Sequence, residues 1–138
     1  MIPKRSPYGL IQEDLYPDEW KCLISCMMLN CTTRKQAEKV MPSFFKKWPN
    51  PLMFLKANEE EVSKEISALG FQNKRAKNLL KMTSAYTLNE WKHASELPGI
   101  GDYASRAWEI FFKNELGKHK PIDGALALYW NWRKKHGS

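Results

Sequence analysis

The sequence predicts an all-α protein, and three observations support this. Apolar residues recur at three- and four-residue spacing in almost every segment, as on one face of a helix. The alternation typical of a strand never persists, and β-branched residues are sparse. Cap residues and glycines separate the segments. At ordinary helix lengths the chain has room for about seven to nine helices, and its 138 residues predict one domain over 1–138.

The first clear helix is "PDEWKCLISCMMLN", residues 17–30. Its predicted inward face holds Trp20, Leu23, Ile24, Met27 and Met28. Thr32 and Thr33 can cap the next helix, and Pro42 is expected to kink or shorten that helix. The inward face of this second helix holds Ala37, Val40, Met41, Phe44 and Phe45.

Shorter helices follow. The segment 50–57 opens with Asn50 followed by proline, which is typical of a helix start. The segment 58–70 begins at Asn58, carries acidic residues in its first turn and is expected to stop at Gly70.

The remaining helices are predicted from basic and aromatic segments. Residues 73–86 form a basic amphipathic helix, and 91–97 lead into a glycine-containing turn. A helix over 102–114 is expected to bury Tyr103, Ala107, Ile110 and Phe111. A last helix, rich in Trp and Tyr, is predicted over 123–135.

The charge and the cysteine content indicate which partners and metals the protein could bind. The formal net charge of +7 favours a polyanionic partner such as nucleic acid. No run is long enough for a membrane span, and the N-terminal residues do not resemble a secretion signal, so we expect an intracellular protein without a membrane partner. Cys22, Cys26 and Cys31 lack the spacing of a zinc site. We expect no metal, and small buried apolar residues at these positions.

The stretch "SELPGIGDYASRA", residues 95–107, interrupts helix formers with two glycines. Gly99 and Gly101 would let a phosphate approach the backbone at the start of the next helix, while Leu97 and Ile100 hold the turn to the core. An ordinary helix–helix turn is the alternative. The full string "LPGIG" in a basic helical protein resembles the helix-hairpin-helix motif of DNA-binding proteins and of a large class of base-excision glycosylases. This resemblance implies two helical layers with an active-site cleft between them.

The glycosylases of this class carry an aspartate about twenty residues after the hairpin, and Asp123 lies 22 positions after Gly101. Taken alone, Asp123 is a helix cap. Under the resemblance it is the catalytic residue, because an ionised carboxylate stabilises the positive charge that forms on the sugar and can orient the attacking water.

Two positions exclude branches of the class. Members that also cut the strand have a lysine two positions after the second hairpin glycine, where this chain has Tyr103. Other members bind an iron–sulfur cluster through four C-terminal cysteines, whereas the last cysteine here is Cys31. The resemblance therefore implies a monofunctional enzyme without a cofactor.

The blocks "RSPYGLIQEDLYPDEWKCLISCMMLN", "LGFQNKRAKNLLK", "ELPGIGDYASRAWEIF" and "PIDGALALYWNW" are similar to the catalytic domain of methyl-CpG-binding-domain thymine-DNA glycosylases. This implies a monomer that acts on double-stranded DNA with thymine or uracil opposite guanine, in the nucleus if the source is eukaryotic. By the same resemblance Gln12 and Tyr103 face the flipped base, and Phe71 is the wedge beside it. Lys74 and Lys77 are expected to contact phosphates.

Three departures from that family, and one difference from the adenine-excising branch, bear on selectivity. Cys31 replaces an arginine that fills the gap left by the flipped base, and Asp102 replaces a lysine. Gly124-Ala125 replace bulkier residues, and Cys26 stands where the adenine-excising branch has a glutamate. Adenine is therefore disfavoured, while a shifted base preference stays open. Two further alternatives are a non-enzymatic helix-hairpin-helix DNA-binding module and a protein-interaction helical bundle.

Overall fold

The computed structural model describes residues 11–30, 32–113, 129 and 132–133, and the regular elements in these ranges are all helical. This confirms the predicted fold class. The α-helices are α1 (Ile11–Leu15), α2 (Glu19–Leu29), α3 (Arg34–Lys47), α4 (Pro51–Phe54), α5 (Glu59–Glu65), α6 (Gln72–Leu88) and α7 (Asp102–Phe111). Two short 3₁₀ helices are η1 (Ser67–Leu69) and η2 (Ala94–Glu96). Most of the helix predicted over 123–135 lies outside the described residues.

Side-chain caps fix where α3, α4 and α5 begin. The Thr33 hydroxyl accepts a hydrogen bond from the backbone N–H of Gln36 at 3.1 Å, and the Gln36 side chain returns to Thr33. Asn58 and Glu61 form the same reciprocal box at the start of α5. Asn50 caps α4 through the backbone N–H of residue 53. These starts are therefore set by local sequence, as predicted.

The structure corrects two predicted helix ends in part. Of the two effects expected of Pro42, a kink or a shorter helix, it contradicts the second, because α3 continues for five more residues to Lys47. Met41 and Phe44 are buried on either side of this exposed proline, and their packing outweighs the lost backbone hydrogen bond. In the next segment, the α-helix ends at Glu65, and Gly70 instead ends the 3₁₀ turn η1, with φ 77°.

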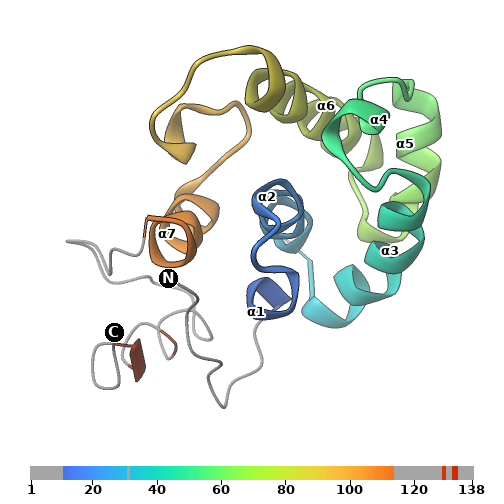
Figure 1. Cartoon of the computed structure of the whole chain (residues 1–138). Coiled ribbons are helices and arrows are strands. Elements are labelled where there is room, and N and C mark those ends of the chain that lie inside the picture. The colour runs from blue at the N-terminus through green and yellow to red at the C-terminus, as the bar shows by residue number, and fades with distance from the viewer. Residues whose placement is uncertain (1–10, 31, 114–128, 130–131, 134–138) are drawn as a thin grey trace.

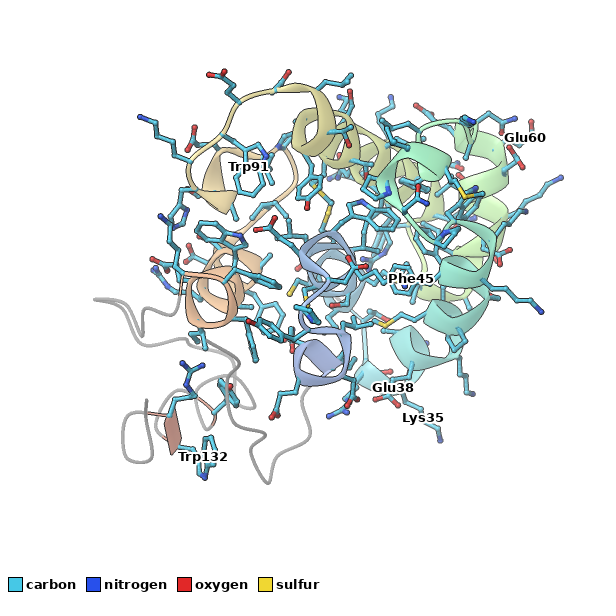
Figure 2. All side chains as sticks on the ribbon, viewed as in Figure 1. Lys35, Glu38, Phe45, Glu60, Trp91 and Trp132 are labelled. Carbon is cyan, nitrogen blue, oxygen red and sulfur yellow. The ribbon has the colours of Figure 1, made fainter. Side chains whose placement is uncertain are left out.

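Helix α2 lies between two packed layers, with α3, α4, α5 and α6 on one side and α7 on the other (Figure 1). One face of α2 contributes to a core shared with α3, α4, α5 and α6, and its other side contacts α7. The larger core contains a cluster of aromatic rings, in which Phe45 reaches from α3 toward α2 (Figure 2). The rings of this cluster belong to Trp20, Phe44, Phe45, Trp48 and Phe54. The two helical layers expected from the sequence are thus present.

Polar contacts tie the two layers together at α2. The Glu19 carboxylate accepts hydrogen bonds from Trp108 Nε1 of α7 at 2.8 Å and from the Tyr86 hydroxyl of α6 at 3.1 Å. Trp20 Nε1 donates to Thr83 Oγ1 of α6 at 3.0 Å. Within residues 11–30 and 32–113, no helix combines the length and apolar character needed to cross a bilayer.

Candidate functional site

A cavity of about 550 Å³ opens where the two layers meet. It is bordered by α1, the C-terminal end of α2, the start of α3, the first turns of α6, and the 97–101 hairpin with the start of α7. Its size is within the range of small-molecule sites. The polar side chains that line it and matter below are Gln12, Arg34, Arg75, Asn78 and Tyr103, together with the thiol of Cys26.

Gln12 is the most buried polar group of this cavity, with 1% of its surface exposed. Its amide nitrogen Nε2 donates to the Tyr103 hydroxyl oxygen at 2.8 Å and to Cys26 Sγ at 3.2 Å. Its carbonyl oxygen Oε1 is buried and has no hydrogen-bond partner among the described residues. A hydroxyl and a thiol can each donate or accept, so turning the amide over would still leave one of its polar atoms unpaired. An unpaired buried polar atom costs about 1–3 kcal/mol, which a bound ligand would offset.

Cys26 lines the cavity but was not among the predicted base-pocket residues, although the resemblance puts it where the adenine-excising branch has a glutamate. We predicted a small buried apolar residue, and Cys26 is indeed buried, at 3% exposed, but it also lines the cavity and contacts Gln12. Cys22, one helical turn earlier, is buried in the core, where burial raises the pKa of its thiol. Its thiol donates to the backbone carbonyl oxygen of Gln12, at 3.7 Å from Sγ. The sequence does hold an indication that Cys26 faces another part of the protein than the main core, because its helical spacing puts it outside the predicted inward face of α2.

The hairpin is attached to the core as predicted. Leu97 is buried, and half-buried Ile100 packs against both core clusters. Gly99 has φ 79°, and a Cβ there would come within 2.8 Å of Met27 Cε. Among the described residues, none lies within 4 Å of a Cβ placed on Gly101, and none caps α7 through its side chain. The backbone at the start of α7 therefore has open space in front of it.

The turn before α6 exposes an aromatic side chain. Phe71 has 73% of its surface exposed and adopts a left-handed backbone with φ 49°. Such a conformation costs about 1 kcal/mol or more for a residue with a side chain. Lys74 and Lys77, on the first two turns of α6, are exposed as well.

Arg75 joins this turn to the end of α2. Its Nε donates to the Gly70 carbonyl at 2.9 Å, and its two terminal nitrogens donate to the carbonyls of Met27 and Asn30 at 3.2 and 2.6 Å. The sequence interpretation missed Arg75, because two of its three acceptors lie more than forty residues away along the chain and only the fold brings them together.

The structure brings Gln12, Tyr103 and the hairpin glycines around one cavity. Asp123, the predicted catalytic residue, lies outside the described residues, as do Cys31 and Gly124-Ala125. Within the described ranges, no group of three His, Cys, Asp or Glu side chains could hold a metal ion.

Comparison with known proteins identifies the family. Residues 24–132 match the model of the HhH-GPD superfamily of base excision DNA repair proteins. The chain is 35% identical over 131 residues to the methyl-CpG-binding domain protein 4-like protein of Arabidopsis thaliana, covering 95% of this chain and 29% of that protein. It is 32% identical over 93 residues to a thymine-DNA glycosylase of Aeropyrum pernix, covering 62% of this chain and 42% of that enzyme. The chain thus spans less than half the length of these relatives.

Solved structures share the fold. A thermostable thymine-DNA glycosylase matches with a TM-score of 0.68 and 23% identity, over 83% of this chain and 54% of the other. An endonuclease III in a non-covalent DNA complex matches with a TM-score of 0.61 and 19% identity, over 89% of this chain and 72% of the other. The fold, the hairpin and the sequence match agree, and the chain belongs to the HhH-GPD superfamily of base excision DNA repair proteins.

Proposed function

We propose that this chain is a monofunctional DNA glycosylase that removes thymine or uracil paired with guanine. The observation that carries the proposal is the buried Gln12 amide, held by Tyr103 and left with one unpaired polar atom in a cavity of about 550 Å³. Relatives named thymine-DNA glycosylase and thymine/uracil-DNA glycosylase support this substrate class.

The Gln12 amide suits a flipped pyrimidine base. Thymine and uracil present an N–H between two carbonyl oxygens, and an amide oxygen can accept from that N–H. The Gln12 orientation seen here has both of its N–H groups directed at Tyr103 and Cys26 and its oxygen unpaired. Pairing with the base would supply the missing donor without disturbing the two existing contacts.

The surface around the cavity suits the DNA backbone and a base stack. The open start of α7 beyond Gly101 offers backbone N–H groups to a phosphate, and the helix dipole favours its negative charge. The exposure of Phe71 supports the role of a wedge that enters the stack, and exposed Lys74 and Lys77 add positive charge on the helix that follows. A G·T or G·U pair is weaker than a matched pair, which lowers the cost of extruding its pyrimidine.

Bond cleavage is assigned to Asp123, whose ionised carboxylate would stabilise the charge on the sugar and orient water. The side chain two positions after Gly101 is the phenol of Tyr103, which cannot form a Schiff base with the sugar. The product is therefore an intact abasic strand. An enzyme of this kind works where the DNA is, which is the nucleus in a eukaryotic cell.

Incubation with end-labelled duplexes containing G·T, G·U, A·U or G·C pairs tests this function. We expect breaks at the G·T and G·U sites after alkali and none before it. Asp123→Asn should abolish excision while duplex binding is kept. Glu60→Gln, the corresponding change at an exposed carboxylate of α5 that does not line the cavity, should leave excision in place. Binding without excision by the unmodified protein would favour the non-enzymatic DNA-binding module, and strand breaks before alkali would contradict the role given to Tyr103.

A further inference from the structure

Arg34 places a positive charge at the edge of the cavity. It is the first residue of α3 and follows Thr33, whose capping box with Gln36 fixes the start of that helix. Its side chain lines the cavity and remains 47% exposed. It forms an ion pair with Glu38, one turn along the same helix, whose side chain is 50% exposed.

The stability of α3 does not account for an arginine here. A cation in the first turn is opposed by the positive end of the helix dipole. An ion pair between two side chains this exposed contributes little, because water screens the charges. The carboxylate of Glu38 can therefore be exchanged at low cost for another anion.

Among the described residues that line the cavity, the cationic side chains are Arg34 and Arg75. Arg75 already donates to the backbone carbonyls of Gly70, Met27 and Asn30, so its position is fixed by the protein. Arg34 instead pairs with the exposed carboxylate of Glu38. It is thus the cation that a ligand at the cavity mouth can recruit.

A nucleotide that enters the cavity carries a phosphate on each side, and the chain of the DNA keeps both at the mouth. We propose that Arg34 binds one of these phosphates through its guanidinium, exchanging Glu38 for the DNA. This inference rests on the proposed function and adds a phosphate contact from α3 to the contacts of the hairpin. A guanidinium suits the role because it can donate two parallel hydrogen bonds to phosphate oxygens.

The test uses a G·T duplex whose thymidine carries 2′-fluorine, so that the glycosidic bond resists cleavage. Dissociation constants are measured between 50 and 200 mM salt for the unmodified protein, Arg34→Gln, Lys35→Gln and Glu38→Gln. Lys35 is the matched control, because it is exposed on the same helix turn, points away from the molecule and does not line the cavity (Figure 2). Each protein also binds duplexes in which one phosphate beside the thymidine is a neutral methylphosphonate.

We expect Arg34→Gln to weaken binding about tenfold and to lower the slope of log Kd against log salt by about one. Lys35→Gln should weaken binding much less, and Glu38→Gln should bind as tightly as the unmodified protein or tighter. One methylphosphonate should weaken the unmodified protein about as much as Arg34→Gln does, and should cost Arg34→Gln nothing further.

Additive effects of Arg34→Gln and of both methylphosphonates would overturn the contact, as would equal losses for Arg34→Gln and Lys35→Gln. Equal losses for Arg34→Gln and Glu38→Gln would mean that the ion pair acts only within α3, and would overturn it too. A different result, in which the unmodified protein binds the G·T duplex no better than a matched duplex, would count against the proposed function itself. Thermal melting confirms that each variant is folded.

Discussion

The two hairpin glycines make opposite predictions when each is replaced by alanine. Gly99 has φ 79°, and a Cβ there would lie 2.8 Å from Met27 Cε and 3.6 Å from Asn78 Cβ. Gly101 has φ −94°, which any residue adopts, and a Cβ there has no atom of the described part of the chain within 4 Å. Folding therefore requires glycine at the first position, whereas only a ligand would require it at the second.

The magnitudes follow from these geometries. Gly99→Ala forces a left-handed backbone on alanine, at a cost of about 1–2 kcal/mol. The close contact adds little, because it involves the flexible end of Met27. For a domain of this size that lowers Tm by roughly 4–8 °C. Gly101→Ala adds no strain and restricts the unfolded chain, so its Tm should stay the same or rise slightly.

DNA binding then separates the two roles. If a phosphate approaches the backbone at Gly101, the added methyl group blocks it and removes a charge-assisted hydrogen bond, which is worth about 1.5–3 kcal/mol. Gly101→Ala should thus bind duplex DNA roughly ten- to hundredfold more weakly while melting like the unmodified protein. Melting by circular dichroism and binding by fluorescence anisotropy measure the two effects. Undiminished DNA binding by Gly101→Ala would refute the phosphate site at the hairpin.

Four further predictions concern single side chains. Glu19→Leu removes the acceptor of the Trp108 and Tyr86 hydrogen bonds and should lower the free energy of unfolding by about 1–3 kcal/mol in denaturant titration. Glu19→Gln should lower it less. Equal losses for the two variants would contradict the role of these hydrogen bonds. Burial and the Glu19 carboxylate raise the pKa of the Tyr86 hydroxyl. The stability that Tyr86 contributes is therefore complete below about pH 10 and is lost as the pH rises above that value. Tyr86→Phe should reduce this loss of stability in melts at pH 8–11. Phe71→Ala should leave Tm nearly unchanged, because the ring is 73% exposed, but should slow excision in single-turnover assays if the ring is a wedge; unchanged excision would exclude that role. Gln12→Leu should abolish discrimination between G·T and G·C duplexes, and a variant that still discriminates would show that recognition lies elsewhere.

Features governed by neighbours in sequence were predictable. The caps at Thr33, Asn50 and Asn58 are confirmed, because a helix start depends on residues within one turn. Four of the five predicted inward residues of α2 are buried, and Met27 is half-buried against the same core. The predicted effect of Pro42 on helix length was wrong, because burial of Met41 and Phe44 decides that length. The local sequence shows that a proline removes a helix hydrogen bond, but it does not show the side-chain packing that offsets this loss.

Taken alone, the sequence determined the helical class, the helix starts and a hairpin whose "LPGIG" string indicates DNA binding, since each depends on a few adjacent residues. Only the tertiary structure decided which side chains share the cavity. It placed Cys26 against Gln12, fixed Arg75 to backbone carbonyls more than forty residues away, and left Arg34 at the edge. The physical reason is that these contacts depend on how two helical layers pack, and packing is set by the whole core rather than by any one segment.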